Sequence, residues 1–257
     1  MEQLVSKSIF LLIIFFALFV FIADGSYITN KFMPRTMNEN NTGNTTTTTP
    51  KTDSTDKEVT NKPVEKADIN NEYLILVNKE HALPENYVPN DLVEPKVPFS
   101  FKGKDPKRQM RNEAANALEQ LFEAADNDEI ELYAQSGYRS YERQKAIFTY
   151  NANRKGQAVA NQTSAIPGQS EHQTGLAMDV TSKEVNFDLI QGFAESEAGE
   201  WLAWVAPKYG YIIRFPKGKE RITGYQYEPW HLRYVGKEVA GEITKRGITL
   251  EEYLEEQ

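Results

Sequence analysis

The spacing of hydrophobic and polar residues predicts one long amphipathic helix and several shorter elements. Residues 105–128 place apolar side chains on one helical face, with Asp105 as the N-cap and Pro106 in the first turn. The stripe consists of Met110, Ala114, Leu118, Leu121, Phe122 and Ala125. Further helices are expected at 140–160, which Ser140 opens, at 197–210, which Gly210 closes, and at 237–247 and 250–254.

Short apolar or alternating runs predict strands between these helices. They lie at 73–77, 130–136, 176–182 and 211–215, and within 227–235. Residues 78–92 suit an extended arm over the surface, and residues 161–175 suit a loop. The elements lack a βαβ rhythm, so we expect the α+β class, with a small antiparallel sheet flanked by helices.

The first 66 residues differ in character from the rest. Lys7 precedes fifteen uncharged apolar residues, 9–23. A membrane-spanning helix needs about 20, so residues 1–25 predict a signal peptide cut after Gly25, with an uncleaved membrane anchor as the alternative. Residues 26–66 are Thr-rich and polar, which predicts a disordered linker. We therefore expect an exported protein with one domain at 67–257, on the outer face of the membrane or in the cell wall.

Composition excludes several classes of function. The chain has 29 Lys and Arg against 37 Asp and Glu, a formal charge of -8, which argues against a nucleic-acid partner. It has no cysteine, so disulfides, thiolate metal sites and a cysteine nucleophile are excluded. A metal would have to be held by His, Asp or Glu.

The chain has only three histidines, and two of them could share a metal with Asp179. His172 lies in a loop, Asp179 follows inside an apolar strand, and His231 lies in an aromatic stretch. Two histidines and one carboxylate can hold Zn²⁺ and leave a fourth position open. A structural interpretation also fits, with Asp179 in a salt bridge and His231 in a polar network.

Glu228 is the candidate base beside such a metal. It precedes Pro229, which disfavours helical geometry, and a regular strand would turn residues 228 and 231 to opposite sides. A turn or bulge at Pro229–Trp230 is needed to bring Glu228 beside His231. The structural alternative is a glutamate that caps a turn.

Several stretches together resemble the VanY/LdcB family of zinc D,D- and L,D-carboxypeptidases, which trim peptidoglycan stem peptides. The combination of S-x-H-x₆-D with E-x-W-H is specific, and the resemblance runs from about residue 73 to residue 254. The stretches are SGYRS (136–140), YERQ (141–144), PGQSEHQTGLAMDV (167–180), YEPWHLRYVG (227–236), LVNKEHALPENYVPNDL (76–92), WVAPKYGYIIRFPKGKERITGY (204–225) and TLEEYL (249–254).

The resemblance implies a fold and a role for each motif residue. The fold would be that of the Hedgehog signalling domain and the D-alanyl-D-alanine dipeptidases, with zinc over a small antiparallel sheet. His172, Asp179 and His231 match the zinc ligands, and Glu228 matches the general base. Arg139 matches the arginine that reaches the scissile end of the substrate, and Gln144 and Ser170 match polar residues of the substrate pocket.

The expected function is removal of the terminal D-alanine from a peptidoglycan stem peptide by a monomeric, exported zinc carboxypeptidase. A D,D-carboxypeptidase acting on D-Ala-D-Ala is the first expectation, and an L,D-carboxypeptidase acting on the tetrapeptide is the alternative. A peptidoglycan endopeptidase and a non-catalytic zinc module that binds the wall are further alternatives. A pure binding module would have no use for a base at Glu228.

Overall fold

The computed structural model describes residues 65–66 and 72–257. The expected signal segment at 1–25 and all of the expected linker except residues 65–66 lie outside this part. Those two residues form β1 (Glu65–Lys66), which pairs in parallel with β2 (His81–Ala82). Within the described residues, no helix is both long enough and apolar enough to cross a membrane.

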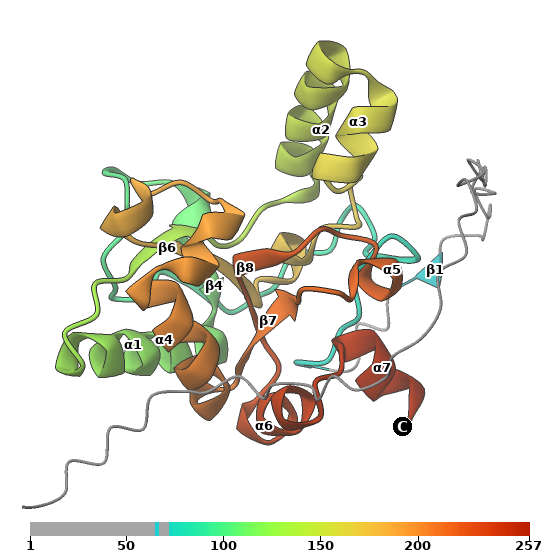
Figure 1. The fold of residues 1–257 in the computed structure, drawn as a ribbon. Coiled ribbons are helices and arrows are strands. Elements are labelled where there is room, and N and C mark those ends of the chain that lie inside the picture. The colour runs from blue at the N-terminus through green and yellow to red at the C-terminus, as the bar shows by residue number, and fades with distance from the viewer. Residues whose placement is uncertain (1–64, 67–71) are drawn as a thin grey trace, which may run out of the picture. The chain divides into compact units, whose positions relative to one another are not determined.

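A four-stranded antiparallel sheet forms the centre of the domain (Figure 1). Its strands, in spatial order, are β5 (Tyr133–Ser136), β6 (Ala177–Thr181), β8 (Glu228–Tyr234) and β7 (Tyr211–Phe215). The expected α+β class and small antiparallel sheet are therefore confirmed. A two-stranded pair, β3 (Leu92–Val93) and β4 (Met110–Arg111), lies outside this sheet.

The two faces of the sheet differ in chemistry because successive strand residues point to opposite sides. Met178, Val180 and Leu232 belong to the largest hydrophobic cluster. Their neighbours Asp179 and His231 are polar, are also buried, and occupy the opposite face. The alternation thus gives the sheet one apolar face and one face that carries charge.

Helices α1 (Asn112–Asn127) and α4 (Glu197–Val205) cover the apolar face. Leu118 and Leu121 of α1 and Leu202 of α4 are fully buried in the same cluster as the strand residues. Each such side chain contributes roughly 1.5–3 kcal/mol by leaving water. The apolar stripe predicted from Met110 to Ala125 therefore packs against the sheet.

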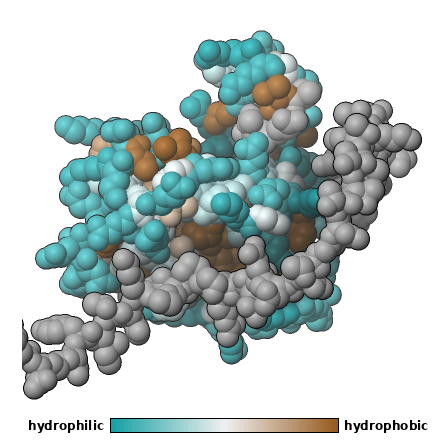
Figure 2. All heavy atoms as spheres, in the orientation of Figure 1, coloured by the Kyte–Doolittle hydropathy of each residue, from teal (hydrophilic) through white to brown (hydrophobic). Residues whose placement is uncertain are grey.

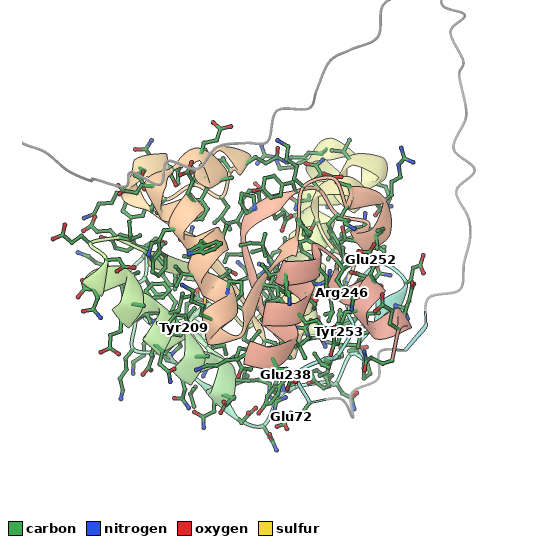
Figure 3. All side chains as sticks on the ribbon, turned by 60° about the horizontal axis from the view of Figure 1, so that its bottom comes forward. Glu72, Tyr209, Glu238, Arg246, Glu252 and Tyr253 are labelled. Atoms are coloured by element: carbon green, nitrogen blue, oxygen red, sulfur yellow. The ribbon has the colours of Figure 1, made fainter. Side chains whose placement is uncertain are left out.

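A second hydrophobic cluster joins the C-terminal helices to the sheet. It includes Ile212 of β7, Ile243 of α6 (Lys237–Arg246), and Leu250 and Tyr253 of α7 (Leu250–Glu255). Figure 3 shows this side, where Arg246 also pairs with Glu242 and Glu256. Helix α7 is thereby fixed close to the charged face of the sheet.

The remaining helices include a hairpin that projects from the domain (Figure 1). It consists of α2 (Tyr141–Lys155), which Ser140 caps as expected, and α3 (Gln157–Thr163). Gly156 separates the two helices with a φ of 84°, so the expected single helix at 140–160 is interrupted. Figure 2 shows a small hydrophobic patch on this otherwise largely hydrophilic hairpin. A one-turn helix, α5 (Glu220–Thr223), precedes β8 in the chain.

Two further predicted elements differ from the structure. Asp105 caps a 3₁₀ turn at Pro106–Arg108, and α1 begins only at Asn112. The strand expected at 73–77 is absent, because the carbonyl groups of Tyr73 and Ile75 accept hydrogen bonds from the guanidinium of Arg233. The buried side chain of Arg233 therefore supplies the hydrogen-bond donors that a neighbouring strand would have supplied.

Candidate zinc centre and active site

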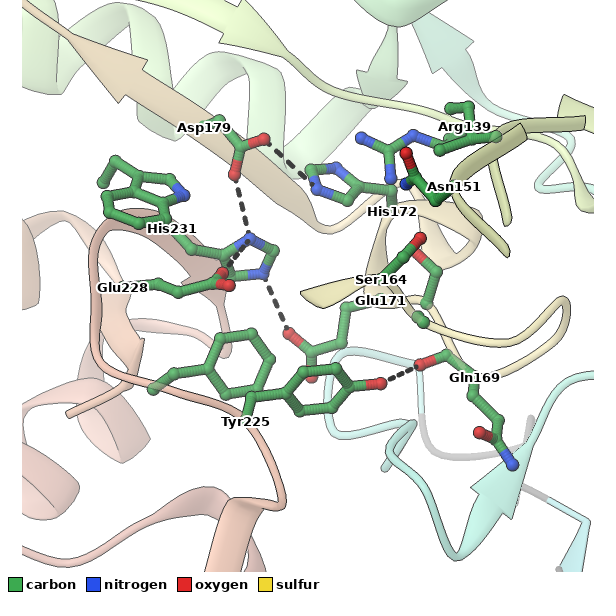
Figure 4. A pocket seen from close by; sticks show the side chains of 15 residues that line it. Arg139, Asn151, Ser164, Gln169, Glu171, His172, Asp179, Tyr225, Glu228 and His231 are labelled. Carbon is green, nitrogen blue, oxygen red and sulfur yellow. Dashed lines mark hydrogen bonds and ion pairs between the residues drawn. The ribbon is translucent and has the colours of Figure 1, made fainter. Parts of the chain in front are cut away.

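The sheet brings two of the three expected ligands together directly. Asp179 of β6 and His231 of β8 are partners in the strand register, so their side chains leave the same face side by side. His231 Nδ1 lies 2.9 Å from Asp179 Oδ1. The third ligand, His172, places Nε2 3.3 Å from Asp179 Oδ2 (Figure 4).

His172 reaches the site from a 3₁₀ helix, Glu171–Thr174, that precedes β6. The Nδ1 atom of His172 is 2.8 Å from the carbonyl oxygen of Gly137. The backbone amide of Arg139 donates a hydrogen bond to the carbonyl oxygen of His172. Gly137 can take this position because it has no Cβ. An added Cβ would lie 2.4 Å from the carbonyl oxygen of Gln109.

These three side chains fit a zinc ion. One donor atom from each can be chosen so that all lie within 4.8 Å of one another, and all three residues are buried. Burial would raise the pKa of Asp179, but His172 and His231 outweigh it and hold that pKa well below its usual range. An ionised carboxylate between two imidazoles is a donor set that Zn²⁺ prefers, and three protein ligands leave a coordination position open.

Glu228, at the start of β8, stands beside His172, Asp179 and His231, which we call the triad. Between Ile213–Leu232 and Phe215–Glu228 the register of β7 and β8 shifts, so β8 carries the bulge that the sequence required. The bulge leaves Glu228 Oε2 4.0 Å from His231 Nδ1. Burial, the largest influence, raises the pKa of Glu228 to about 7, although His231 and Arg139 oppose the shift.

Arg139 and its neighbours form the opposite wall of the site. Arg139 donates hydrogen bonds to Gln144 Oε1 at 2.9 Å and to Ser136 Oγ at 3.1 Å, and both of these side chains are neutral. Gln144 is buried and in turn donates to the carbonyl of Ala165 at 2.6 Å. Gln144 therefore holds Arg139 in place, and direct contact between Gln144 and a substrate stays a prediction.

A cavity of about 230 Å³ opens over the triad. Arg139, Ser170 and Glu228 line it together with the three candidate ligands, whereas Gln144 lies behind its wall. The rest of the wall comes from α2, from the loop after α3, from aromatic residues of β7 and β8, and from Tyr225 in the segment between α5 and β8. The principal residues there are Ile147, Asn151, Ser164, Phe215, Tyr225 and Trp230.

Four charged residues that the motifs did not predict lie beneath the triad. Glu171, Arg214, Arg233 and Glu251 are buried and form what we call the ionic cluster. Burial would raise the pKa of Glu171, but Arg214 and Arg233 together lower it far below its usual range. A signal was present: Arg214 and Arg233 alternate with apolar residues inside YIIRF and HLRY, and a buried arginine requires a carboxylate.

Comparison with known proteins places the chain in a family. The model for VanY, D-alanyl-D-alanine carboxypeptidase, matches residues 107–237. YodJ of Bacillus subtilis (strain 168) is 55% identical over 182 residues, which are 71% of this chain and 67% of YodJ.

Two solved structures share the fold. LdcB, an LD-carboxypeptidase, is 52% identical, with a TM-score of 0.71 over 76% of this chain and 94% of LdcB. A variant of the D,D-pentapeptidase VanY in complex with Zn(II) is 34% identical, with a TM-score of 0.58 over 71% of this chain and 99% of that one. Together with the His172–Asp179–His231 donor set, these matches show that the chain belongs to the VanY family and is a zinc metallocarboxypeptidase.

Proposed function

We propose that this chain releases the C-terminal D-alanine from peptidoglycan stem peptides, with Arg139 as the residue that selects a free C-terminus. The observation that carries the proposal is the environment of Arg139. Its guanidinium borders the cavity, and both of its hydrogen bonds go to neutral groups. A substrate carboxylate would give Arg139 an anionic hydrogen-bond acceptor and form a charge-assisted pair.

Glu228 has the position and proton affinity of a general base. Bound zinc would polarise the scissile carbonyl group and make a water molecule more acidic. Glu228, whose pKa lies near 7, would accept the proton of the attacking water and return it to the leaving amine. Arg139 would hold the terminal carboxylate and fix the scissile bond between the triad and Glu228.

We favour the tetrapeptide, and hence L,D-activity, as the substrate class. The support is the difference in identity between the two structural relatives: 52% for the LD-carboxypeptidase LdcB and 34% for the D,D-pentapeptidase VanY. The sequence motifs do not decide between the two specificities, because both share every motif, and D,D-activity was the first expectation. D,D-activity remains the second candidate, and it is favoured by the description of the family model.

The test uses zinc-loaded protein with muramyl tetrapeptide and muramyl pentapeptide in separate reactions, and follows D-alanine release. We expect faster release from the tetrapeptide. Glu228→Ala, the matched control, should bind zinc and release none. Faster release from the pentapeptide would replace L,D- by D,D-activity, and no release from either would overturn the proposed function.

We further propose that the protein acts outside the cytoplasmic membrane. The support is the uncharged apolar segment 9–23 behind Lys7 and the location of the substrate class in the cell wall. Protease treatment of intact cells should degrade the protein while a cytoplasmic marker survives. Protection of the protein until the cells are lysed would contradict export.

A further inference from the structure

Glu171 lies beside the zinc centre without being one of the three candidate ligands. It is fully buried and directly precedes His172. Its Oε1 accepts hydrogen bonds from Arg214 Nε at 2.7 Å and from Arg233 Nη1 at 2.5 Å. Its other oxygen, Oε2, lies 3.4 Å from Nε2 of His231 (Figure 4).

The two nitrogens of the His231 ring therefore face different carboxylates. Nδ1 faces Asp179 and the metal side, whereas Nε2 faces Glu171. A neutral imidazole carries one proton, so a metal bound at Nδ1 requires that proton to lie on Nε2, where Glu171 can accept it. His172 is arranged in the opposite sense, with Nε2 towards Asp179 and Nδ1 on the neutral carbonyl of Gly137.

The ionic cluster prevents Glu171 from turning away. Arg214 continues from Glu171 to Glu251 of α7, with hydrogen bonds of 2.9 and 2.6 Å to its two oxygens. Asn78 donates to Glu251 at 3.1 Å, and Arg233 is fixed by the carbonyl groups of Tyr73 and Ile75. Charge-assisted, two-point contacts of this kind restrict a side chain more than single neutral bonds do.

We propose that Glu171 is a positioning residue for the zinc centre: it holds the His231 ring with Nε2 protonated and Nδ1 presented to the metal. The ionic cluster keeps the Glu171 carboxylate in register with that ring. The inference rests on the zinc site of the proposed function but not on the choice of peptide substrate. Outer carboxylates that orient a metal-binding histidine typically change metal affinity by about 10–100-fold when removed.

The test compares Glu171→Gln with Glu251→Gln, which removes a carboxylate from the same cluster without touching His231. Zinc affinity is measured by competition with a chromogenic chelator, and thermal unfolding is measured alongside. We expect Glu171→Gln to bind zinc at least tenfold more weakly and to alter the absorption spectrum of the Co²⁺-substituted protein. Glu251→Gln should lose stability but keep zinc affinity within about threefold, because Arg214 and Arg233 still bind Glu171 directly.

Equal zinc affinity of Glu171→Gln and the wild type would overturn the proposal, as would an equal loss in both variants. If Glu171→Gln does not fold, the ring can be read in the wild type by long-range ¹H–¹⁵N spectra of the zinc-loaded protein. There the proposal requires a protonated Nε2 on His231 with slow exchange, and a protonated Nδ1 would overturn it. Failure of the wild type to bind zinc at all would instead reject the zinc site of the proposed function.

Discussion

At the scale of single residues, the site depends on how the environment of each carboxylate sets its proton affinity. Asp179 and Glu228 approach the same imidazole, His231, at 2.9 and 4.0 Å. Two histidines surround Asp179 and lower its pKa, whereas burial dominates at Glu228 and raises its pKa to about 7. Asp179 therefore suits metal binding, and Glu228 suits proton transfer near neutral pH.

The pH profile of kcat/KM should report the ionisation of Glu228. A base works only when it is deprotonated, so activity should be present above the pKa of Glu228 and fall as the pH drops through it. Zinc adds positive charge nearby and lowers this pKa, so we expect the acid limb between the ordinary value of 4.5 and about 7. Measured profiles of wild type and Glu228→Gln check this, because any residual activity of the variant should lack that limb. The same limb in both proteins would assign it to another group.

At the scale of elements, the sequence predicted most helices and strands but not the joints that shape the site. The stripe in residues 105–128 was visible because helix packing repeats along the chain, and Asp179 and His231 fall in strands that were expected. The irregular positions depend on distant partners. Arg233 donates hydrogen bonds to the carbonyl groups that a strand at 73–77 would use for pairing. The spacing of apolar residues within that segment does not reveal a partner so distant in the sequence.

The candidate ligands of the zinc site could be named from motifs, whereas their supports could not. S-x-H-x₆-D and E-x-W-H predicted the four residues that the fold brings together, and the bulge that joins Glu228 to His231 was required by strand geometry. Glu171, Arg214 and Glu251 come from three separate parts of the chain. Only the fold shows that they meet.

Gly137 lies directly after β5, and its replacement should affect both stability and zinc binding. In Gly137→Ala the new Cβ would meet the carbonyl oxygen of Gln109 at 2.4 Å and Met178 Cε at 2.8 Å, so the backbone must shift. We expect a loss of about 1–3 kcal/mol in the free energy of unfolding. Zinc affinity should fall as well, because the carbonyl of Gly137 accepts the hydrogen bond of His172. Denaturant titration and chelator competition measure the two effects.

Gly241→Ala is the matched control for that substitution. Gly241 lies inside α6, and nothing stands within 4 Å of the Cβ that alanine would add. Alanine in a helix interior should stabilise the protein by roughly 0.5–1 kcal/mol relative to glycine. Unchanged stability and zinc affinity in Gly137→Ala would show that the close approach at Gly137 is not needed.

At the scale of the whole molecule, the metal centre and the hydrophobic core occupy different faces of one sheet. The core under α1 and α4 involves none of the three zinc ligands. Metal binding should therefore add to the stability of a domain that already folds.

Removal of zinc should lower the melting temperature without unfolding the protein at 25 °C. A ligand that binds only the folded state stabilises it by about 4 kcal/mol at a thousandfold excess over its Kd. Thermal scans with and without a chelator, read by circular dichroism, measure the shift. An unchanged melting temperature would contradict zinc binding to the folded domain, and loss of the helical signal at 25 °C would contradict a metal-independent core.

We propose that His172, Asp179 and His231 hold the zinc at which Glu228 acts. An anomalous difference map at the zinc absorption edge, from crystals of the zinc-loaded, active protein, would locate the metal. We expect one peak bounded by His172 Nε2, Asp179 and His231 Nδ1, with Glu228 alongside and unbound to the metal. A zinc peak elsewhere, or a metal held through Nε2 of His231, would contradict it.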